Sequence, residues 1–309
     1  MFAALLRASL LWLAERRWMG RLALRLPFLR RVPLRFVAGT TLEHGIAAVR
    51  AVNRAGAAAT VDILGESVTD QSAAERSAAG YVSAIERIAA EELDANVSLK
   101  LSQMGLDLGN EICLAVLRPV VEAGKRHGIF VRVDMESSAY TDQTLEVVNA
   151  LRAEGFDIGP VIQAYLHRSA GDVERLAAEQ VRVRVCKGAY AEEESIAWHD
   201  RMAVNGSFVD LVTTLLEADA YPGVATHDPA MIEAVARAAH QRGIGPAAYE
   251  FQMLYGVRRD LQRQLVEKRY RMRIYVPFGT EWYPYFMRRL AERPANVLFI
   301  VRSLFGERA

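Results

Sequence analysis

From about residue 57 onward, short apolar runs rich in β-branched residues alternate with longer segments that have helical periodicity. The short runs predict eight strands, at Thr60 to Leu64, Val97 to Leu101, Ile129 to Asp134, Pro160 to Tyr165, Val181 to Cys186, Gly223 to Thr226, Tyr249 to Met253 and Arg273 to Val276. Helices are expected between them, at Ala73 to Glu92, Glu111 to His127, Thr141 to Glu154, Val173 to Glu179, Phe208 to Ala218, Ala230 to Gln241 and Arg258 to Glu267. Capping-type residues precede several of these helices, namely Thr69, Asp70, Thr141, Asp172 and Asp228.

Strict alternation of strand and helix favours parallel βαβ units. Eight such units in roughly 250 residues are what a closed (β/α)8 barrel needs, and a doubly wound open sheet is the alternative. We therefore expect an α/β protein of the TIM-barrel type, with an N-terminal helical arm at 1–56 and a catalytic barrel at 57–309.

Polar residues stand at the carboxyl ends of nearly all the expected strands, where a barrel carries its chemistry. They are Lys100, Asp134, Gln163, Arg184, Lys187, Thr226, His227, Gln252 and Tyr275. A single polar residue of this kind can be explained as the solvated end of a strand. Because seven strands end in this way, we expect their polar side chains to converge on one pocket. An aspartate that ends an apolar run is costly to bury alone, so we expect Asp134 to pair with a cation, either Lys100 or Arg184.

The composition of the chain argues against several classes of function. A formal net charge of +1 and the lack of any nucleic-acid-binding fingerprint give no reason to expect nucleic acid as a partner. The chain has only 2 cysteines, which fits a reducing cytoplasm, and no apolar run reaches the ~20 residues that span a bilayer. No motif with metal-ligand spacing is present, which argues against a metal-dependent barrel hydrolase.

The first 36 residues have a basic amphipathic composition. Eight arginines stand against one acid, Glu15, among leucines, Trp12 and Trp18. Such a segment can lie in an anionic membrane interface, or its helices can simply pack on the domain. Both readings stay open.

Beyond the eighth strand the chain predicts a helix on which Tyr285, Arg288, Arg289 and Glu292 share a face. An adjacent arginine pair can fork onto one carboxylate, while a surface ladder of ion pairs is the plainer interpretation.

This stretch, with a strand ending in Tyr, a Pro-x-Gly turn and Tyr-x-x-Arg-Arg-x-x-Glu, resembles the C-terminal signature of the proline dehydrogenase family. Further motifs along the barrel agree with it, and the resemblance covers roughly residues 57 to 305. These motifs are Ser98-Leu99-Lys100, Val133-Asp134-Met135-Glu136, Val161 to Leu166, Arg184 to Tyr190, Ala225 to Asp228 and Tyr249 to Gly256. Asp228, where the family often has Asn, and Cys186, at a usually aliphatic position, are mild departures.

The resemblance implies FAD-dependent oxidation of L-proline to Δ1-pyrroline-5-carboxylate, with the final helix over the barrel mouth. Substrate would be bound by Lys100, Arg288 and Arg289 at the carboxylate and by Tyr275, Tyr285 and Leu254 at the ring, with Glu292 supporting the arginines. FAD would be bound by Met135, Gln163, Arg184, Lys187, Gly188, Ala189, Thr226 and His227. Asp134 would lie between flavin and substrate and Arg184 near the flavin N5, which makes these two the catalytic candidates.

The same resemblance implies membrane quinone as electron acceptor, which would give the basic arm a role in peripheral contact with the inner face of the cell membrane. It also implies a monofunctional enzyme, whose product a separate pyrroline-5-carboxylate dehydrogenase would consume. Two other functions remain as alternatives: a Schiff-base aldolase using Lys187 or Lys100, and a non-catalytic binding protein.

Overall fold

The computed structural model describes residues 35–65 and 67–292, with side chains up to Met287. Eight parallel strands form a closed barrel in the order of the chain. They are β1 (Ala58–Ile63), β2 (Ala95–Leu99), β3 (Val131–Val133), β4 (Ile158–Gln163), β5 (Arg184–Cys186), β6 (Gly223–Ala225), β7 (Glu250–Leu254) and β8 (Met272–Phe278). Because β1 pairs with both β2 and β8, the barrel is confirmed and the open sheet is excluded.

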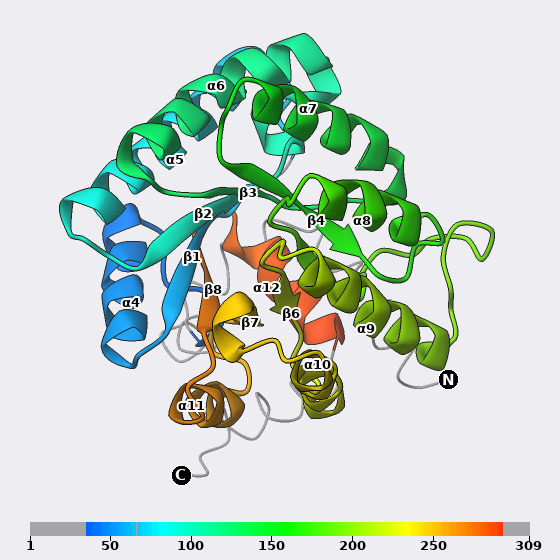
Figure 1. Ribbon diagram of the computed structural model, residues 1–309. Coiled ribbons are helices and arrows are strands. Elements are labelled where there is room, and N and C mark those ends of the chain that lie inside the picture. The colour runs from blue at the N-terminus through cyan, green and yellow to red at the C-terminus, as the bar shows by residue number, and fades with distance from the viewer. Residues whose placement is uncertain (1–34, 66, 293–309) are drawn as a thin grey trace.

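Helices surround this ring (Figure 1). They are α4 (Leu42–Arg54), α5 (Gln71–Ala90), α6 (Asn110–His127), α7 (Thr141–Ala153), α8 (Ser169–Ala178), α9 (Arg201–Glu217), α10 (Pro229–Gln241) and α11 (Arg259–Glu267). The last described helix, α12 (Trp282–Glu292), follows β8 and crosses the centre of the ring in the same view. In the described part of the chain, no helix has both the length and the apolar character that crossing a bilayer requires.

Of the five residues that were predicted to cap helices, two do so. The side chains of Asp70 and Asp228 accept hydrogen bonds from backbone N–H groups at the starts of α5 and α10, as predicted. Thr69, Thr141 and Asp172 are not caps: Thr69 precedes the Asp70 cap, Thr141 is the first residue of α7, and Asp172 lies inside α8.

The start of α9 was also predicted wrongly, at Phe208. The helix begins at Arg201, because the side chain of Asp200 accepts a hydrogen bond from the N–H of Ala203 at 2.7 Å and so satisfies the first turn. The residues from Arg201 to Ser207 include Gly206, and none of them is buried, so they lack the buried apolar face that begins at Phe208.

Helix α4 lies within the range assigned to the N-terminal arm and buries Ile46 and Val49 in the same core as the strands. Residues 1–34 of the arm lie outside the described residues. The division at residue 56 stays a prediction.

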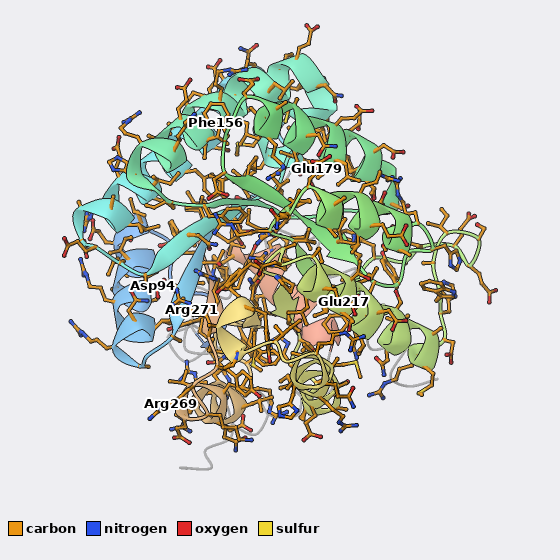
Figure 2. The ribbon with its side chains drawn as sticks, in the orientation of Figure 1. Asp94, Phe156, Glu179, Glu217, Arg269 and Arg271 are labelled. Carbon is orange, nitrogen blue, oxygen red and sulfur yellow. The ribbon has the colours of Figure 1, made fainter. Side chains whose placement is uncertain are left out.

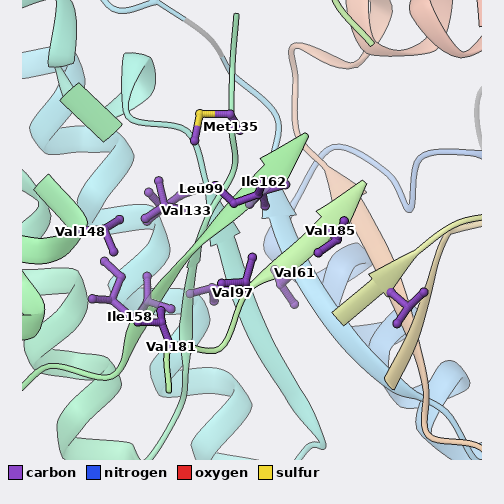
Figure 3. Packing of buried hydrophobic residues seen from close by; sticks show 14 of the residues in the cluster. Val61, Val97, Leu99, Val133, Met135, Val148, Ile158, Ile162, Val181 and Val185 are labelled. Atoms are coloured by element: carbon purple, nitrogen blue, oxygen red, sulfur yellow. The ribbon is translucent and has the colours of Figure 1, made fainter. Parts of the chain in front are cut away.

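One face of each strand packs against the helices and is apolar. Val61, Val97, Leu99, Val133 and Val185 are fully buried there, in one continuous core with the inward faces of the helices (Figure 3). Successive side chains of a strand point to opposite faces, so the residues between these must face the barrel interior.

The barrel interior is polar. Arg184 on β5 donates hydrogen bonds to Ser98 on β2 and to Gln252 on β7, strands that are not its neighbours, so these bonds cross the interior. Buried polar side chains of Thr60 and Asn96 also bond to each other, at 2.6 Å. Barrels of this kind are usually filled by branched apolar residues, so a charged interior points to function at this place.

The opposite end of the barrel, where the strands begin, carries an ion pair at the surface. Arg271, just before β8, contacts the carboxylate of Asp94, just before β2, at 2.6 Å (Figure 2). Both side chains are exposed, so we expect such pairs to contribute little to stability.

Candidate active site

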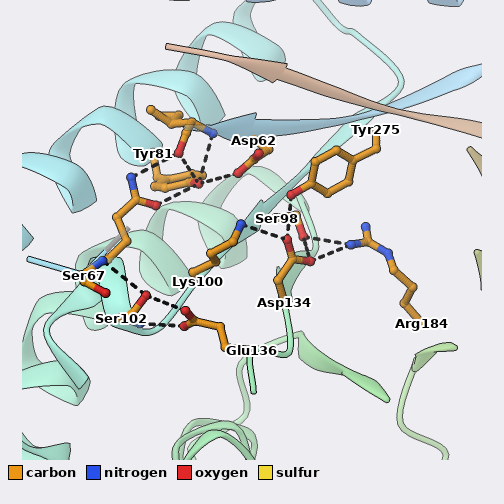
Figure 4. A network of polar contacts seen from close by, with 12 residues as sticks. Asp62, Ser67, Tyr81, Ser98, Lys100, Ser102, Asp134, Glu136, Arg184 and Tyr275 are labelled. Carbon is orange, nitrogen blue, oxygen red and sulfur yellow. Dashed lines mark hydrogen bonds and ion pairs between the residues drawn. The ribbon is translucent and has the colours of Figure 1, made fainter. Parts of the chain in front are cut away.

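The centre of the site is the carboxylate of Asp134, which follows β3. It accepts hydrogen bonds from Ser98 Oγ at 2.7 Å and Arg184 Nη1 at 2.7 Å on Oδ1, and from Tyr275 Oη at 2.6 Å on Oδ2 (Figure 4). Lys100 Nζ lies 3.7 Å from Oδ2. Asp134 therefore pairs with both of the cations that the sequence offered as alternatives.

Charge compensation decides the protonation state of this buried group. Burial works against ionisation, but the charges of Arg184 and Lys100 and the hydrogen bonds from Tyr275 and Ser98 outweigh it and lower the pKa of Asp134. The group stays a carboxylate at neutral pH.

Arg184 is held from several sides. Its guanidinium carbon lies 5.2 Å from the centre of the Tyr275 ring, its Nε donates to Gln252 Oε1, and its Nη1 donates to Asp134 and Ser98. Its Nη2 is buried and has no hydrogen-bond partner within residues 35–65 and 67–292. A buried donor without a partner is costly, so a ligand with an acceptor atom would fit here.

A second group of predicted residues follows β5, β6 and β7. Lys187 Nζ contacts Asp228 Oδ2 at 3.0 Å, and Thr226 Oγ1 accepts a hydrogen bond from the N–H of Asp228. The N–H of Leu254 donates to His227 Nε2 at 2.9 Å, so the proton of a neutral His227 ring must be on Nδ1. Four side chains are thereby fixed in orientation.

Gly188 allows a close approach that no other residue would. Its φ is +113°, and a Cβ built there would lie 2.2 Å from Cδ1 of Tyr165. The backbone after Lys187 therefore lies directly against the Tyr165 ring, and Ala189 is exposed.

The remaining predicted residues are placed as follows. Met135 and Gln163 are buried after β3 and at the end of β4, and Gln163 Nε2 donates to the carbonyl of Glu136 at 2.7 Å, so Gln163 is not a solvated strand end. Tyr285 is buried on α12. The side chains of Arg288, Arg289 and Glu292 lie outside the described residues.

The sequence reasoning missed Asp62 on β1. This carboxylate is 1% exposed, Tyr81 Oη lies 3.4 Å from its Oδ1, and its Oδ2 has no hydrogen-bond partner in the described part of the chain. Burial raises the pKa of Asp62 to about 6, and the nearby charge of Lys100 offsets only part of that effect. The signal was present, because Asp62 is the only charged residue in the expected strand Thr60 to Leu64.

These features define a class of protein: a (β/α)8-barrel enzyme with a cluster of charged, largely buried side chains at the carboxyl ends of its strands. The model of the proline dehydrogenase family matches residues 46–302. The chain belongs to this family, and it is an oxidoreductase that oxidises proline.

Comparison with individual proteins supports the same family. The chain is 40% identical over 270 residues to proline dehydrogenase 1 of Bacillus subtilis subsp. natto, covering 87% of this chain and 89% of that protein. It is 38% identical over 309 residues to proline dehydrogenase of Deinococcus radiodurans, covering 98% and 99%. Among solved structures it resembles proline utilization A from Bdellovibrio bacteriovorus inactivated by N-propargylglycine, with a TM-score of 0.79 and 27% identity. That match covers 85% of this chain and 33% of the larger protein.

Proposed function

We propose that this chain converts L-proline to Δ1-pyrroline-5-carboxylate with FAD as its bound cofactor. The observation that carries the proposal is the ionised Asp134 with Arg184, Lys100 and Tyr275 around it at the mouth of the barrel. Family membership supports the choice of substrate.

The residues present fit a flavin. The buried Nη2 of Arg184, which has no partner among the described residues, needs an acceptor of the kind that a flavin ring provides. FAD would be held by Met135, Gln163, Arg184, Lys187, Gly188, Ala189, Thr226 and His227. When bound, it supplies the two-electron acceptor that the ring carbon of proline requires.

The protein's own part in the reaction is binding and electrostatics. Lys100, Arg288 and Arg289 would bind the substrate carboxylate, with Glu292 orienting the arginines. Tyr275, Tyr285 and Leu254 would enclose the ring and exclude water. Fixing the ring in one orientation supplies much of the rate enhancement for such a transfer.

Asp134 and Arg184 would act at the reacting atoms. The substrate nitrogen must be neutral for the ring carbon to give up a hydride, and an ionised Asp134 favours the positive charge that develops on that nitrogen as the imine forms. The cation of Arg184 would stabilise the negative charge that the cofactor acquires. In this proposal a carboxylate would face the positive charge that develops on the substrate nitrogen, and a guanidinium would face the negative charge that develops on the cofactor.

An absorbance spectrum of the purified protein tests this proposal, recorded before and after anaerobic addition of L-proline. We expect a flavin spectrum that bleaches with L-proline. R184M should lose flavin or its reduction by proline, whereas R118M, which removes an exposed arginine paired with Glu154, should behave as wild type. A colourless protein that remains colourless after FAD is supplied would refute the proposal, and trapping of a carbonyl substrate on Lys187 or Lys100 by borohydride would support the aldolase.

The electron acceptor is proposed to be membrane quinone, with the protein in the cytoplasm and in peripheral contact with the inner face of the cell membrane. The support is the composition of residues 1–36, whose eight arginines would attract anionic lipid. Deletion of residues 1–36 should weaken sedimentation with anionic liposomes. Equal sedimentation of the truncated and full-length proteins would contradict this role. A separate pyrroline-5-carboxylate dehydrogenase is the proposed consumer of the product.

A further inference from the structure

A line of buried side chains joins Arg184 to the far part of the barrel interior. Glu250 Oε1 accepts hydrogen bonds from Arg273 Nε and from Gln252 Nε2, each at 2.6 Å. Gln252 Oε1 in turn accepts a hydrogen bond from Arg184 Nε. Arg273, Glu250, Gln252 and Arg184 are all less than 10% exposed, so each bond forms away from water.

Glu250 determines which way the Gln252 amide points. Burial disfavours its charge, but Arg273 outweighs that effect and lowers the pKa of Glu250, so the group is ionised and can only accept hydrogen bonds. The amide must therefore turn its NH2 toward Glu250, which leaves its oxygen toward Arg184. With a neutral partner at position 250, the amide could take either orientation.

Gly223 on β6 makes room for this amide. A Cβ built at Gly223 would lie 2.4 Å from Gln252 Nε2 and 3.0 Å from Cδ of the same side chain. The close approach is to the amide itself, so a larger residue at position 223 would displace it.

The consequence for Arg184 is that three of its five N–H groups have partners from the protein. Nε bonds to Gln252, and Nη1 bonds to Ser98 and Asp134. Because a guanidinium is planar, three fixed bonds determine the direction of Nη2, the nitrogen that has no partner within the described residues.

We propose that Gln252 and Glu250 are positioning residues for Arg184, which set the orientation of its guanidinium toward the cofactor from inside the barrel. The inference rests on the proposed function, because it takes a flavin as the group that Arg184 faces. In this proposal Gln252 acts through Arg184, and Glu250 acts through Gln252.

The test is the flavin midpoint potential of Q252M in the full-length, flavin-loaded protein, measured by equilibration with a reference dye. The substitution keeps the length of the side chain and removes the acceptor of Arg184 Nε. We expect the ratio of reduced to oxidised flavin at a given dye potential to fall about tenfold, which is about 30 mV for a two-electron couple. The matched control is Q71M, because Gln71 donates to the carboxylate of Glu75 at 2.8 Å in the same way but on the exposed surface.

A further variant keeps the result decisive. E250Q should shift the potential in the same direction but less, because the amide at 252 is then free to turn, and it decides the question if Q252M does not fold.

Wild-type potentials and spectra in folded Q252M and E250Q would overturn the inference. Failure of the proposed function looks different, because the wild-type protein itself would then lack flavin or fail to bleach with proline, and the inference would fall with it.

Discussion

The buried carboxyl of Asp62 predicts a specific pH dependence of stability. Among the described residues, the titratable side chains that act on it are Tyr81 from α5, Lys100 after β2, Asp134 after β3 and Tyr275 from β8. In the folded protein burial raises its pKa from 3.8 to about 6. The folded state therefore holds a proton on Asp62 over a range of pH in which the unfolded state has lost it.

The sign follows from linkage. Stability contributed by the neutral form is fully present below the unfolded pKa of 3.8 and is lost as the pH rises through the folded pKa of about 6. A difference of roughly two pKa units corresponds to about 3 kcal/mol, since one unit is about 1.4 kcal/mol. Above pH 6 the wild-type protein carries this cost in full.

D62N keeps the shape of the side chain and removes the titration. We expect its free energy of unfolding to exceed that of the wild type by up to about 3 kcal/mol at pH 8 and by little near pH 4. Urea unfolding followed by circular dichroism at several pH values from 4 to 8 measures the difference, in which the other titrating groups cancel.

The control is D210N, which removes a carboxylate from an exposed position on α9 and should give no comparable change with pH. A difference between D62N and wild type that does not vary with pH would refute the reasoning. So would a variant that is less stable at pH 8 than at pH 4 relative to wild type, since that would show Asp62 ionised and stabilised by Lys100.

Three other substitutions test the site and the core. D134N leaves Arg184 without its carboxylate partner, so we expect kcat/KM for proline to fall by on the order of 10², and stopped-flow flavin reduction within a few-fold of wild type would contradict this. G188A must both adopt a φ of +113° and displace the Tyr165 ring, so it should cost about 1–3 kcal/mol in urea unfolding, and an unchanged midpoint would show that the backbone and the ring adapt. F251A removes a fully buried ring whose centroid is 5.5 Å from that of Tyr249; we expect a loss of about 3–5 kcal/mol by the same measurement, and a loss under 1 kcal/mol would indicate that the core refills the space.

The barrel could be predicted because its strands are short and strongly apolar on the face toward the helices. Val97 and Leu99, for example, are fully buried and belong to a run whose β-branched character predicts a strand. The pairing of Asp134 with a cation could also be predicted, because a charge at the end of such a run has to be compensated. Both inferences depend on local sequence alone.

The hydrogen-bond partners of Arg184 could not be predicted, because they depend on how the barrel closes. Arg184 reaches Ser98 across 86 positions of sequence and Gln252 across 68, and no local pattern specifies those distances. The wrong cap prediction at Asp172 has a different, local origin. The residue has the right type for a cap, but α8 begins at Ser169, so Asp172 lies inside the helix and pairs along it with Arg168 and Arg175.

The polar interior nevertheless leaves a pattern that a sequence can show. On five strands two polar residues stand two positions apart, at Thr60 and Asp62, at Asn96 and Ser98, at Arg132 and Asp134, at Glu250 and Gln252, and at Arg273 and Tyr275. Such spacing puts both members of a pair on the same face of a strand. In an open sheet packed between two layers of helices, that face would bury charges against apolar helices at a high cost, whereas a closed barrel lets the pairs from different strands meet one another. Polar pairs at this spacing on several parallel strands therefore favour closure, and they identify the face that will form the interior before any contact is known. Since buried ion pairs contribute little net stability, their presence here is better explained by the orientation that they give to Arg184 and Asp134.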